Sequence, residues 1–76
     1  LNLTPPDWCI LVIQIALVMA AEAFNTAIEK LCDAVSPEKN PLIGAAKDIA
    51  AGAVLITAIA AVISGLFLFL PKILEL

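Results

Sequence analysis

Two long uncharged segments, one in each half of the chain, dominate its hydropathy pattern. The first covers residues 8–21 and the second residues 49–70, and both consist almost entirely of apolar and small side chains. As an α-helix the second segment is about 33 Å long, enough to cross a hydrocarbon core of about 30 Å. The first reaches that length only by continuing through Glu22 and several polar residues beyond it. The pattern predicts two membrane-spanning helices, the first with an acidic residue inside the membrane.

Prolines and capping residues set the expected helix boundaries. The segment Thr4-Pro5-Pro6-Asp7 is typical of a helix start, with a threonine cap, proline in the first turn and an acidic residue three positions after the cap. Proline disfavours a helical conformation in the residue before it, so Ser36-Pro37 should end the first helix, and Pro71 should end the second. We therefore expect an all-α hairpin in a single membrane domain, residues 1–76, with helices at about 5–35 and 41–70 and a loop at 36–40.

The composition also favours membrane insertion. Of the 76 residues, 63% are hydrophobic and 14% are charged, and the mean hydropathy is +1.11. A short soluble chain buries only about 60% of the surface that it exposes when unfolded, too little to hide these side chains from water. The net charge of −3 argues against a nucleic-acid partner. Cys9 and Cys32 lack the spacing of a metal site, and we expect both to be small buried hydrophobic residues.

The distribution of lysines predicts the orientation of the hairpin. Lys30, Lys39 and Lys47 cluster around the expected loop, whereas the opposite end of the hairpin has only Lys72. Loops with an excess of lysine and arginine usually face the cytosol. We therefore expect the loop on the cytosolic side.

Small residues crowd the second helix. Alanine and glycine make up most of residues 44–53, and five more small residues follow between 58 and 65. In lipid, small side chains let helices approach closely, so this helix should pack against other helices. Two helices cannot shelter it on all sides, and we expect an oligomer or a longer chain.

Polar side chains in the first helix share one face. Glu22, Asn25, Thr26, Glu29 and Asp33 follow helical spacing, and Lys47 and Asp48 stand opposite them at the start of the second helix. Three carboxylates on one stripe repel one another unless a cation lies among them. Oxygen ligands without histidine suit Mg²⁺, which usually binds together with phosphate groups.

Depth in the membrane separates two of these carboxylates. If Trp8 marks the outer interface, Glu22 lies about 21 Å further along the helix and Glu29 about 31 Å. Glu22 is then about 9 Å inside the hydrocarbon core, where the hydroxyl of a lipid can reach it. Glu29 is at the cytosolic boundary, within reach of a soluble nucleotide. Carboxylates inside a membrane are costly and commonly functional.

Structural interpretations remain open for each residue of this face. Glu29, Lys30 and Asp33 can form an ordinary solvated helix end, and Glu22 can pair with a neighbouring side chain. Asn25 and Thr26 can hold helices together by hydrogen bonds. Lys47 and Asp48 can anchor the second helix at the interface. These interpretations leave the shared face unexplained.

Two segments carry a resemblance to a known family. Residues 22–33, EAFNTAIEKLCD, together with residues 46–55, AKDIAAGAVL, closely resemble the prokaryotic diacylglycerol kinases, which include the undecaprenol kinases. The resemblance covers nearly the whole chain. It implies a homotrimer in the bacterial inner membrane, with three membrane-spanning helices per subunit preceded by an amphipathic surface helix. It also implies phosphorylation of a lipid alcohol with Mg²⁺ and ATP.

The resemblance assigns a role to each matching residue. Glu22 corresponds to the catalytic base next to the lipid, Glu29 to a ligand of Mg²⁺ at the nucleotide, and Ala51 to a lipid contact together with residues 65–70. Asn25, Thr26 and Asp33 are supporting polar residues. The nucleotide contacts implied are Glu38, Lys39, Asn40, Lys47 and Asp48, with Lys47 on the phosphates.

The chain departs from the family pattern in two places. Many members have histidine where this chain has Asn40. We also expect the chain to correspond to the C-terminal two-thirds of the enzyme, without the amphipathic helix, the first membrane-spanning helix and a second glutamate ligand of Mg²⁺. The segment alone should therefore be an incomplete enzyme.

Two other functions compete with a lipid kinase. One is the proton-carrying hairpin subunit of a rotary ATPase ring, which needs a deep carboxylate and usually a glycine-repeat face. Here the second segment has no acid and glycine is scarce. The other is a structural hairpin without catalytic activity. No glycine-rich phosphate loop is present in the sequence, so a kinase site must position phosphates with carboxylates, metal and lysine.

Overall fold

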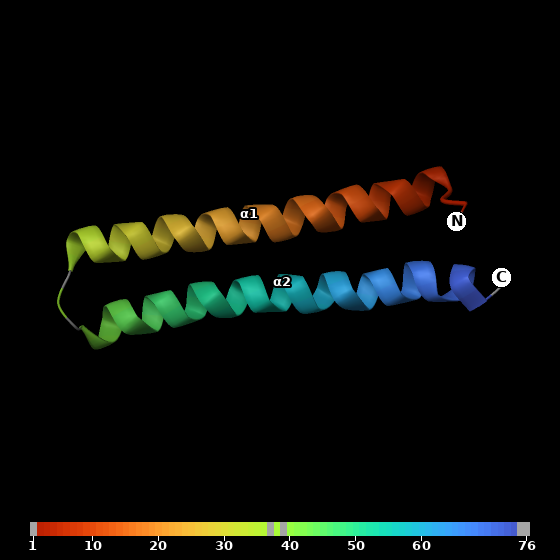
Figure 1. Ribbon diagram of the computed structural model, residues 1–76. Helices are drawn as coiled ribbons and strands as arrows, with labels where there is room; N and C mark the ends of the chain where they lie inside the picture. The colour runs from red at the N-terminus through yellow and green to blue at the C-terminus, as the bar shows by residue number, and fades with distance from the viewer. Residues whose placement is uncertain (1, 37, 39, 75–76) are drawn as a thin grey trace.

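A computed structural model shows a hairpin of two antiparallel helices and describes residues 2–36, 38 and 40–74 (Figure 1). Helix α1 spans Pro5–Val35 and helix α2 spans Pro41–Leu74. The hairpin measures 55 × 18 × 13 Å, so it is one helix pair wide and much longer than it is thick. The expected all-α hairpin is confirmed, and the described residues contain no strand.

A reciprocal cap fixes the start of α1. The backbone N–H of Asp7 donates to Thr4 Oγ1 at 3.3 Å, and the Thr4 N–H donates to Asp7 Oδ2 at 3.0 Å. Two of the backbone donors that a helix start leaves unpaired are satisfied in this way. At the other end, the Ser36 N–H donates to the carbonyl of Cys32 at 2.9 Å. Helix α1 therefore covers the residues that the capping pattern predicts.

Helix α2 begins as expected but ends later. The Asn40 side chain caps its first turn, accepting a hydrogen bond from the Leu42 N–H at 2.9 Å. The expectation that Pro71 ends this helix is wrong, because α2 continues through Pro71 to Leu74. A proline inside a helix loses one backbone hydrogen bond and crowds the preceding turn, but its fixed φ suits a helix. Lys72 also pairs with Asp7 at 3.1 Å, which holds this last turn against the start of α1.

The helices meet along a narrow seam. The least exposed residues of α1 alternate at spacings of four and three, and those of α2 include a series with the same alternation, as in antiparallel coiled coils. The α1 residues are Asp7, Leu11, Gln14, Val18, Ala21, Asn25, Ile28 and Cys32, and the α2 series is Ile43, Lys47, Ala50, Val54, Thr57, Ala61, Ser64 and Leu68. Other α2 residues beside this series are also only partly exposed, namely Ala46, Gly52, Ala58, Gly65, Phe69 and Lys72. Among the described residues only Cys32 and Ala50 are buried, with 7% and 8% of their surface exposed. The expected burial of the cysteines is right for Cys32 and wrong for Cys9, which faces outward from the pair.

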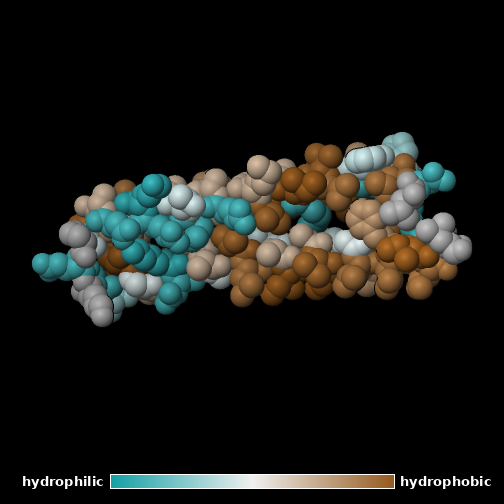
Figure 2. Space-filling model, viewed as in Figure 1, coloured by the Kyte–Doolittle hydropathy of each residue, from teal (hydrophilic) through white to brown (hydrophobic). Residues whose placement is uncertain are grey.

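Most of the apolar surface therefore faces outward. Both helices are long and apolar enough to cross a membrane. Figure 2 shows most of the hydrophilic residues gathered at the loop end of the pair, a smaller group at the opposite end, and mainly hydrophobic residues between them. The hairpin thus has a long apolar body between two polar ends, the larger of which is the loop end, as expected for a hairpin that spans a membrane.

The fold and the lysine distribution together generate a test of orientation. With Cys9 and Cys32 replaced by serine, a Ser36→Cys variant should react with a membrane-impermeant thiol reagent only when the cytosolic side is accessible. An Asn2→Cys variant is the matched control, because residue 2 lies at the opposite end of the hairpin and should react from outside (Figure 1). Labelling of Ser36→Cys from outside intact cells would contradict the cytosolic placement of the loop.

Candidate functional site

The polar face of α1 divides into two parts. Asn25 is turned into the seam with α2, whereas Glu22 and Thr26 are exposed on the flank of the helix. Glu22 and Thr26 line a shallow hollow of about 500 Å³ together with Met19, Ala23, Ala27 and Lys30. Helical spacing predicts that these polar residues share one face of α1. In the structure, Asn25 points towards α2, whereas Glu22 and Thr26 point away from it.

Asn25 and Glu29 form a pair within α1. The Asn25 Nδ2 donates to Glu29 Oε1 at 3.1 Å, an orientation of the amide that follows from this hydrogen bond. The Asn25 Oδ1 is buried and has no hydrogen-bond partner. An unpaired buried carbonyl oxygen costs about 1–3 kcal/mol, so a donor or a cation at this point would be favourable. The Asn25 side chain therefore bonds to Glu29 within α1 and makes no hydrogen bond to the described residues of α2.

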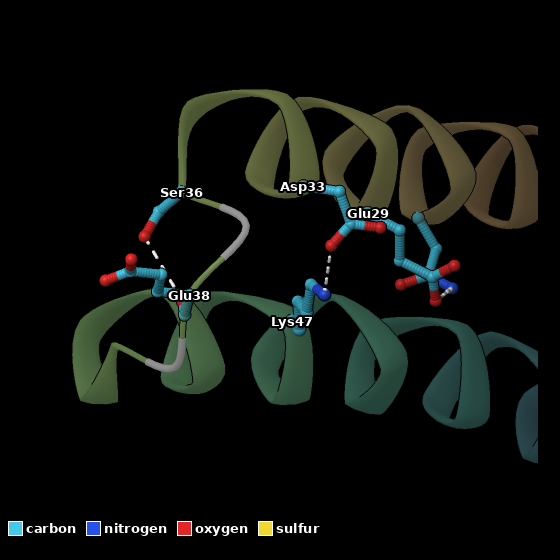
Figure 3. A network of polar contacts seen from close by, with 6 residues as sticks. Glu29, Asp33, Ser36, Glu38 and Lys47 are labelled. Atoms are coloured by element: carbon cyan, nitrogen blue, oxygen red, sulfur yellow. Dashed lines mark hydrogen bonds and ion pairs between the residues drawn. The ribbon is translucent and has the colours of Figure 1, made fainter.

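Asp33 and Lys47 join the two helices. The Lys47 Nζ donates to Asp33 Oδ1 at 2.5 Å, across a sequence separation of 14 residues (Figure 3). The side chain of Lys47 is 37% exposed and that of Asp33 is 66% exposed. Water therefore screens the ion pair, and its contribution to stability is small. The main consequence of the ion pair is that it determines the position of the Lys47 ammonium.

Lys47 remains charged in this arrangement. It lies on the loop side of the uncharged segment 49–70, outside the part of α2 that spans the membrane. The Asp33 carboxylate, hydrogen bonded to the ammonium, raises the pKa of Lys47 above its ordinary value. A permanent positive charge at this position suits the binding of phosphate groups.

A second hollow, of about 550 Å³, opens at the loop end of the hairpin. Ligand sites in proteins commonly measure about 300–1,000 Å³. Three residues expected at the nucleotide, Glu38, Asn40 and Lys47, line this hollow, and Asp33 lines it with them. Lys39, also expected there, lies outside the described residues. The structure therefore brings part of the expected nucleotide site together around one cavity.

The Asn40 side chain also has a structural role in capping helix α2. Its side-chain oxygen caps α2, so its amide nitrogen is the group that can donate to a ligand. The Ser36 hydroxyl donates to the backbone carbonyl of Glu38 at 3.3 Å and shapes the loop between the helices. Loop and helix start thus form one wall of the hollow.

Some residues of the hollow were not singled out from the sequence. Ser36, Pro41, Ile43 and Gly44 also line it. Gly44 could have been found, because positions 40, 44 and 47 have the spacing of one helix face. A side chain at Gly44 would meet nothing within 4 Å, so the glycine leaves open space there.

Asp48 and Ala51 lie apart from this cavity. Both side chains are exposed on α2, and neither lines the two hollows described above. Asp48 follows Lys47 directly and is therefore rotated by about 100° around the helix axis. In the hairpin it cannot share the face that Lys47 turns towards α1. Asp48 and Ala51, three positions apart, share a neighbouring face of α2.

The described residues do not form a complete metal site. No group of three acidic, cysteine or histidine side chains in the described ranges is close enough to hold an ion. Mg²⁺ at a nucleotide, however, needs only one or two carboxylates in addition to phosphate and water oxygens. The Glu29 carboxylate and the unpaired Asn25 oxygen beside it have the chemistry of such a partial site.

Comparison with known proteins identifies the family. The family model described as prokaryotic diacylglycerol kinase matches residues 1–69. The undecaprenol kinase of Bacillus subtilis is 43% identical over 67 residues, which cover 88% of this chain and 54% of that protein. The diacylglycerol kinase of Synechocystis is 48% identical over 68 residues, covering 88% of this chain and 39% of that protein.

A third relative, the diacylglycerol kinase of Escherichia coli K12, is 44% identical over 55 residues, covering 72% of this chain and 45% of that protein. The chain thus spans about half the length of the curated relatives that it matches. No solved structure matches it significantly. Neither the family nor these relatives support the rotary ATPase alternative. With its two long apolar helices, the chain is a membrane protein that belongs to the prokaryotic diacylglycerol kinase family.

Proposed function

We propose that this chain supplies the catalytic helices of an ATP-dependent lipid kinase, which transfers the γ-phosphate of ATP to the hydroxyl of a membrane lipid alcohol. Diacylglycerol and undecaprenol are the candidate substrates, because the relatives are named for these lipids. The observation that carries the proposal is the order in which polar groups occur along the hairpin. A cavity with a charged lysine lies at the loop end, and carboxylates follow along α1 towards its apolar part.

In this proposal the loop-end hollow receives the nucleotide. Lys47 binds the phosphates with its ammonium, and Glu38 and Asn40, which line the same hollow, contact the nucleoside. Lys39 and Asp48 complete the proposed set of nucleotide contacts. The cytosolic placement of the loop, proposed from the lysine distribution, gives this hollow access to ATP in the bacterial cytosol.

Glu29 is the proposed ligand of Mg²⁺. Asn25 orients its carboxylate through the hydrogen bond of 3.1 Å, which leaves the second carboxylate oxygen for the ion. When bound, Mg²⁺ neutralises charge on the phosphates and helps to orient them for transfer. Because phosphoryl transfer depends mainly on positioning and charge neutralisation, a site with few side chains is sufficient.

Glu22 is the proposed general base. Its exposed carboxylate lies in a hollow whose other walls are largely apolar, formed by Met19, Ala23 and Ala27, and therefore suited to a lipid tail. Glu22 accepts the proton of the lipid hydroxyl. The hydroxyl oxygen then bonds to the γ-phosphorus, while the bond from that phosphorus to the bridging oxygen of ADP breaks. Thr26 lies in the same hollow, and Ala51 on α2 is a proposed lipid contact.

The separation of the two carboxylates predicts different effects of their loss. Glu22 and Glu29 are about 10 Å apart along the helix axis, too far for both to bind one ion whose bonds to oxygen are about 2 Å. Glu29→Gln should weaken binding of Mg-ATP and also lower turnover. Glu22→Gln should leave nucleotide affinity nearly unchanged but lower the rate about 100-fold or more, because the base is lost. Nucleotide binding and lipid phosphorylation by the full-length protein measure the two effects separately.

An Asp7→Asn variant is the control for this pair, because Asp7 lies at the opposite end of α1 and should alter neither quantity. Equal loss of ATP affinity in Glu22→Gln and Glu29→Gln would contradict the assignment of Glu22 as the base. The polar face would then act as one metal cluster.

The proposed enzyme is a homotrimer. In the isolated hairpin the apolar side chains of both helices are largely exposed, and the described residues complete only part of a metal site at Glu29. Helices of neighbouring subunits would cover this apolar surface and supply further metal ligands. The full-length protein should therefore crosslink as a trimer in lipid or detergent. A monomer that retains full kinase activity would refute the assembly.

A further inference from the structure

Two hydrogen bonds keep a lysine and a glutamate of the proposed site apart. The Glu29 carboxylate accepts a hydrogen bond from Asn25, and the Lys47 ammonium donates to Asp33. Figure 3 shows Glu29 and Asp33 on the same side of α1, facing α2, with Lys47 reaching up from α2 to Asp33. Each charged group is thus held by a partner of its own.

A different pairing is within reach of these side chains. Glu29 and Asp33 are four positions apart, which brings their Cβ atoms to about 6 Å on one helix face. Figure 3 shows the Glu29 side chain next to Asp33, on the side of α1 that Lys47 approaches. A change of rotamer in the flexible lysine side chain could therefore move the ammonium from Asp33 to Glu29.

Such a change would disturb both halves of the nucleotide site. An ammonium on Glu29 competes with Mg²⁺ for the same carboxylate oxygens. It also draws the positive charge of Lys47 away from the loop-end hollow, which Asp33 and Lys47 line together. The pair with Asp33 prevents both effects at once.

We propose that Asp33 is a positioning residue, which holds the Lys47 ammonium at the loop-end hollow and keeps it off the Glu29 carboxylate. The inference rests on the proposed function, in which Lys47 binds phosphates and Glu29 binds the metal. Asp33 lines the loop-end hollow together with Lys47, and the proposal gives it no bond to the reacting atoms. Its effect on the metal is indirect and passes entirely through Lys47.

The test compares Asp33→Asn in two backgrounds of the full-length protein. The probe is the Mn²⁺ complex of a non-hydrolysable ATP analogue, and its binding is followed by electron paramagnetic resonance. Loss of a group that supports a metal ligand typically lowers metal affinity about 10- to 100-fold. In protein that retains Lys47, we expect Asp33→Asn to lower the affinity for the Mn²⁺ complex at least about 10-fold. In the Lys47→Met background the Lys47 ammonium is absent and cannot compete at Glu29, so most of this loss should disappear.

Two further variants separate positioning from a structural role. Asp33→Glu keeps the negative charge and should retain most of the affinity for the Mn²⁺ complex. Asp7→Asn weakens the other ion pair between the helices, which joins Asp7 to Lys72 at the far end, and should leave this affinity unchanged. A structural role of ion pairs between the helices would make Asp7→Asn and Asp33→Asn lose affinity alike.

The outcomes are distinct. An equal loss in the Lys47 and Lys47→Met backgrounds, or a similar loss from Asp7→Asn, overturns the inference while the proposed kinase stands. A wild-type protein that neither binds the Mn²⁺ complex nor phosphorylates a lipid alcohol refutes the proposed function, and the inference with it.

Discussion

The cost of placing charged groups in hydrocarbon governs the arrangement of this hairpin. A charged side chain at the centre of a membrane-spanning helix costs about 2.5–3.5 kcal/mol even on the scale derived from biological insertion. The segments 8–21 and 49–70 obey this constraint by carrying no charge. Most of the remaining charged groups lie at the loop end, where the helices emerge from their apolar bodies, and the Asp7–Lys72 pair lies at the opposite end (Figure 2). Several carboxylates and a lysine come together at the loop end, which is where the proposed nucleotide site lies.

The same constraint relates position along α1 to chemistry. Asp33 and Lys47 meet near the loop, where both side chains are still open to water. Glu29 follows one turn further along and is held by Asn25, whose own oxygen is already buried. Glu22 lies further again, among apolar side chains. In the proposed kinase, a soluble nucleotide would approach α1 from its loop end, and a lipid alcohol would approach Glu22 from the surrounding membrane.

Local signals in the sequence predicted the fold well. Thr4 and Asp7 form the expected cap, and α1 covers the expected range, because capping depends on residues within one turn. Pro71 misled the prediction, because α2 continues past it to Leu74 and the pairing of Lys72 with Asp7, a contact between the helices, holds this last turn. Helical spacing likewise identified the shared face of Glu22, Glu29 and Asp33.

Contacts between the helices could not be predicted in the same way. The pairing of Lys47 with Asp33, and the place of Asp48 on another face, depend on how the two helices are rotated against each other. That rotation follows from a seam of alternating spacing along both helices, which charge and composition alone do not reveal. The chain spans only about half the length of the relatives that it matches.

Direct observation of phosphoryl transfer tests the central claim most sharply. The full-length protein would be reconstituted in vesicles that contain diacylglycerol or undecaprenol, with Mg²⁺ and ATP labelled at its γ-phosphate. We expect the label to appear in the phosphorylated form of one of these lipids, and only when Mg²⁺ is present. Hydrolysis of ATP without labelling of either lipid would contradict a lipid kinase built on these helices.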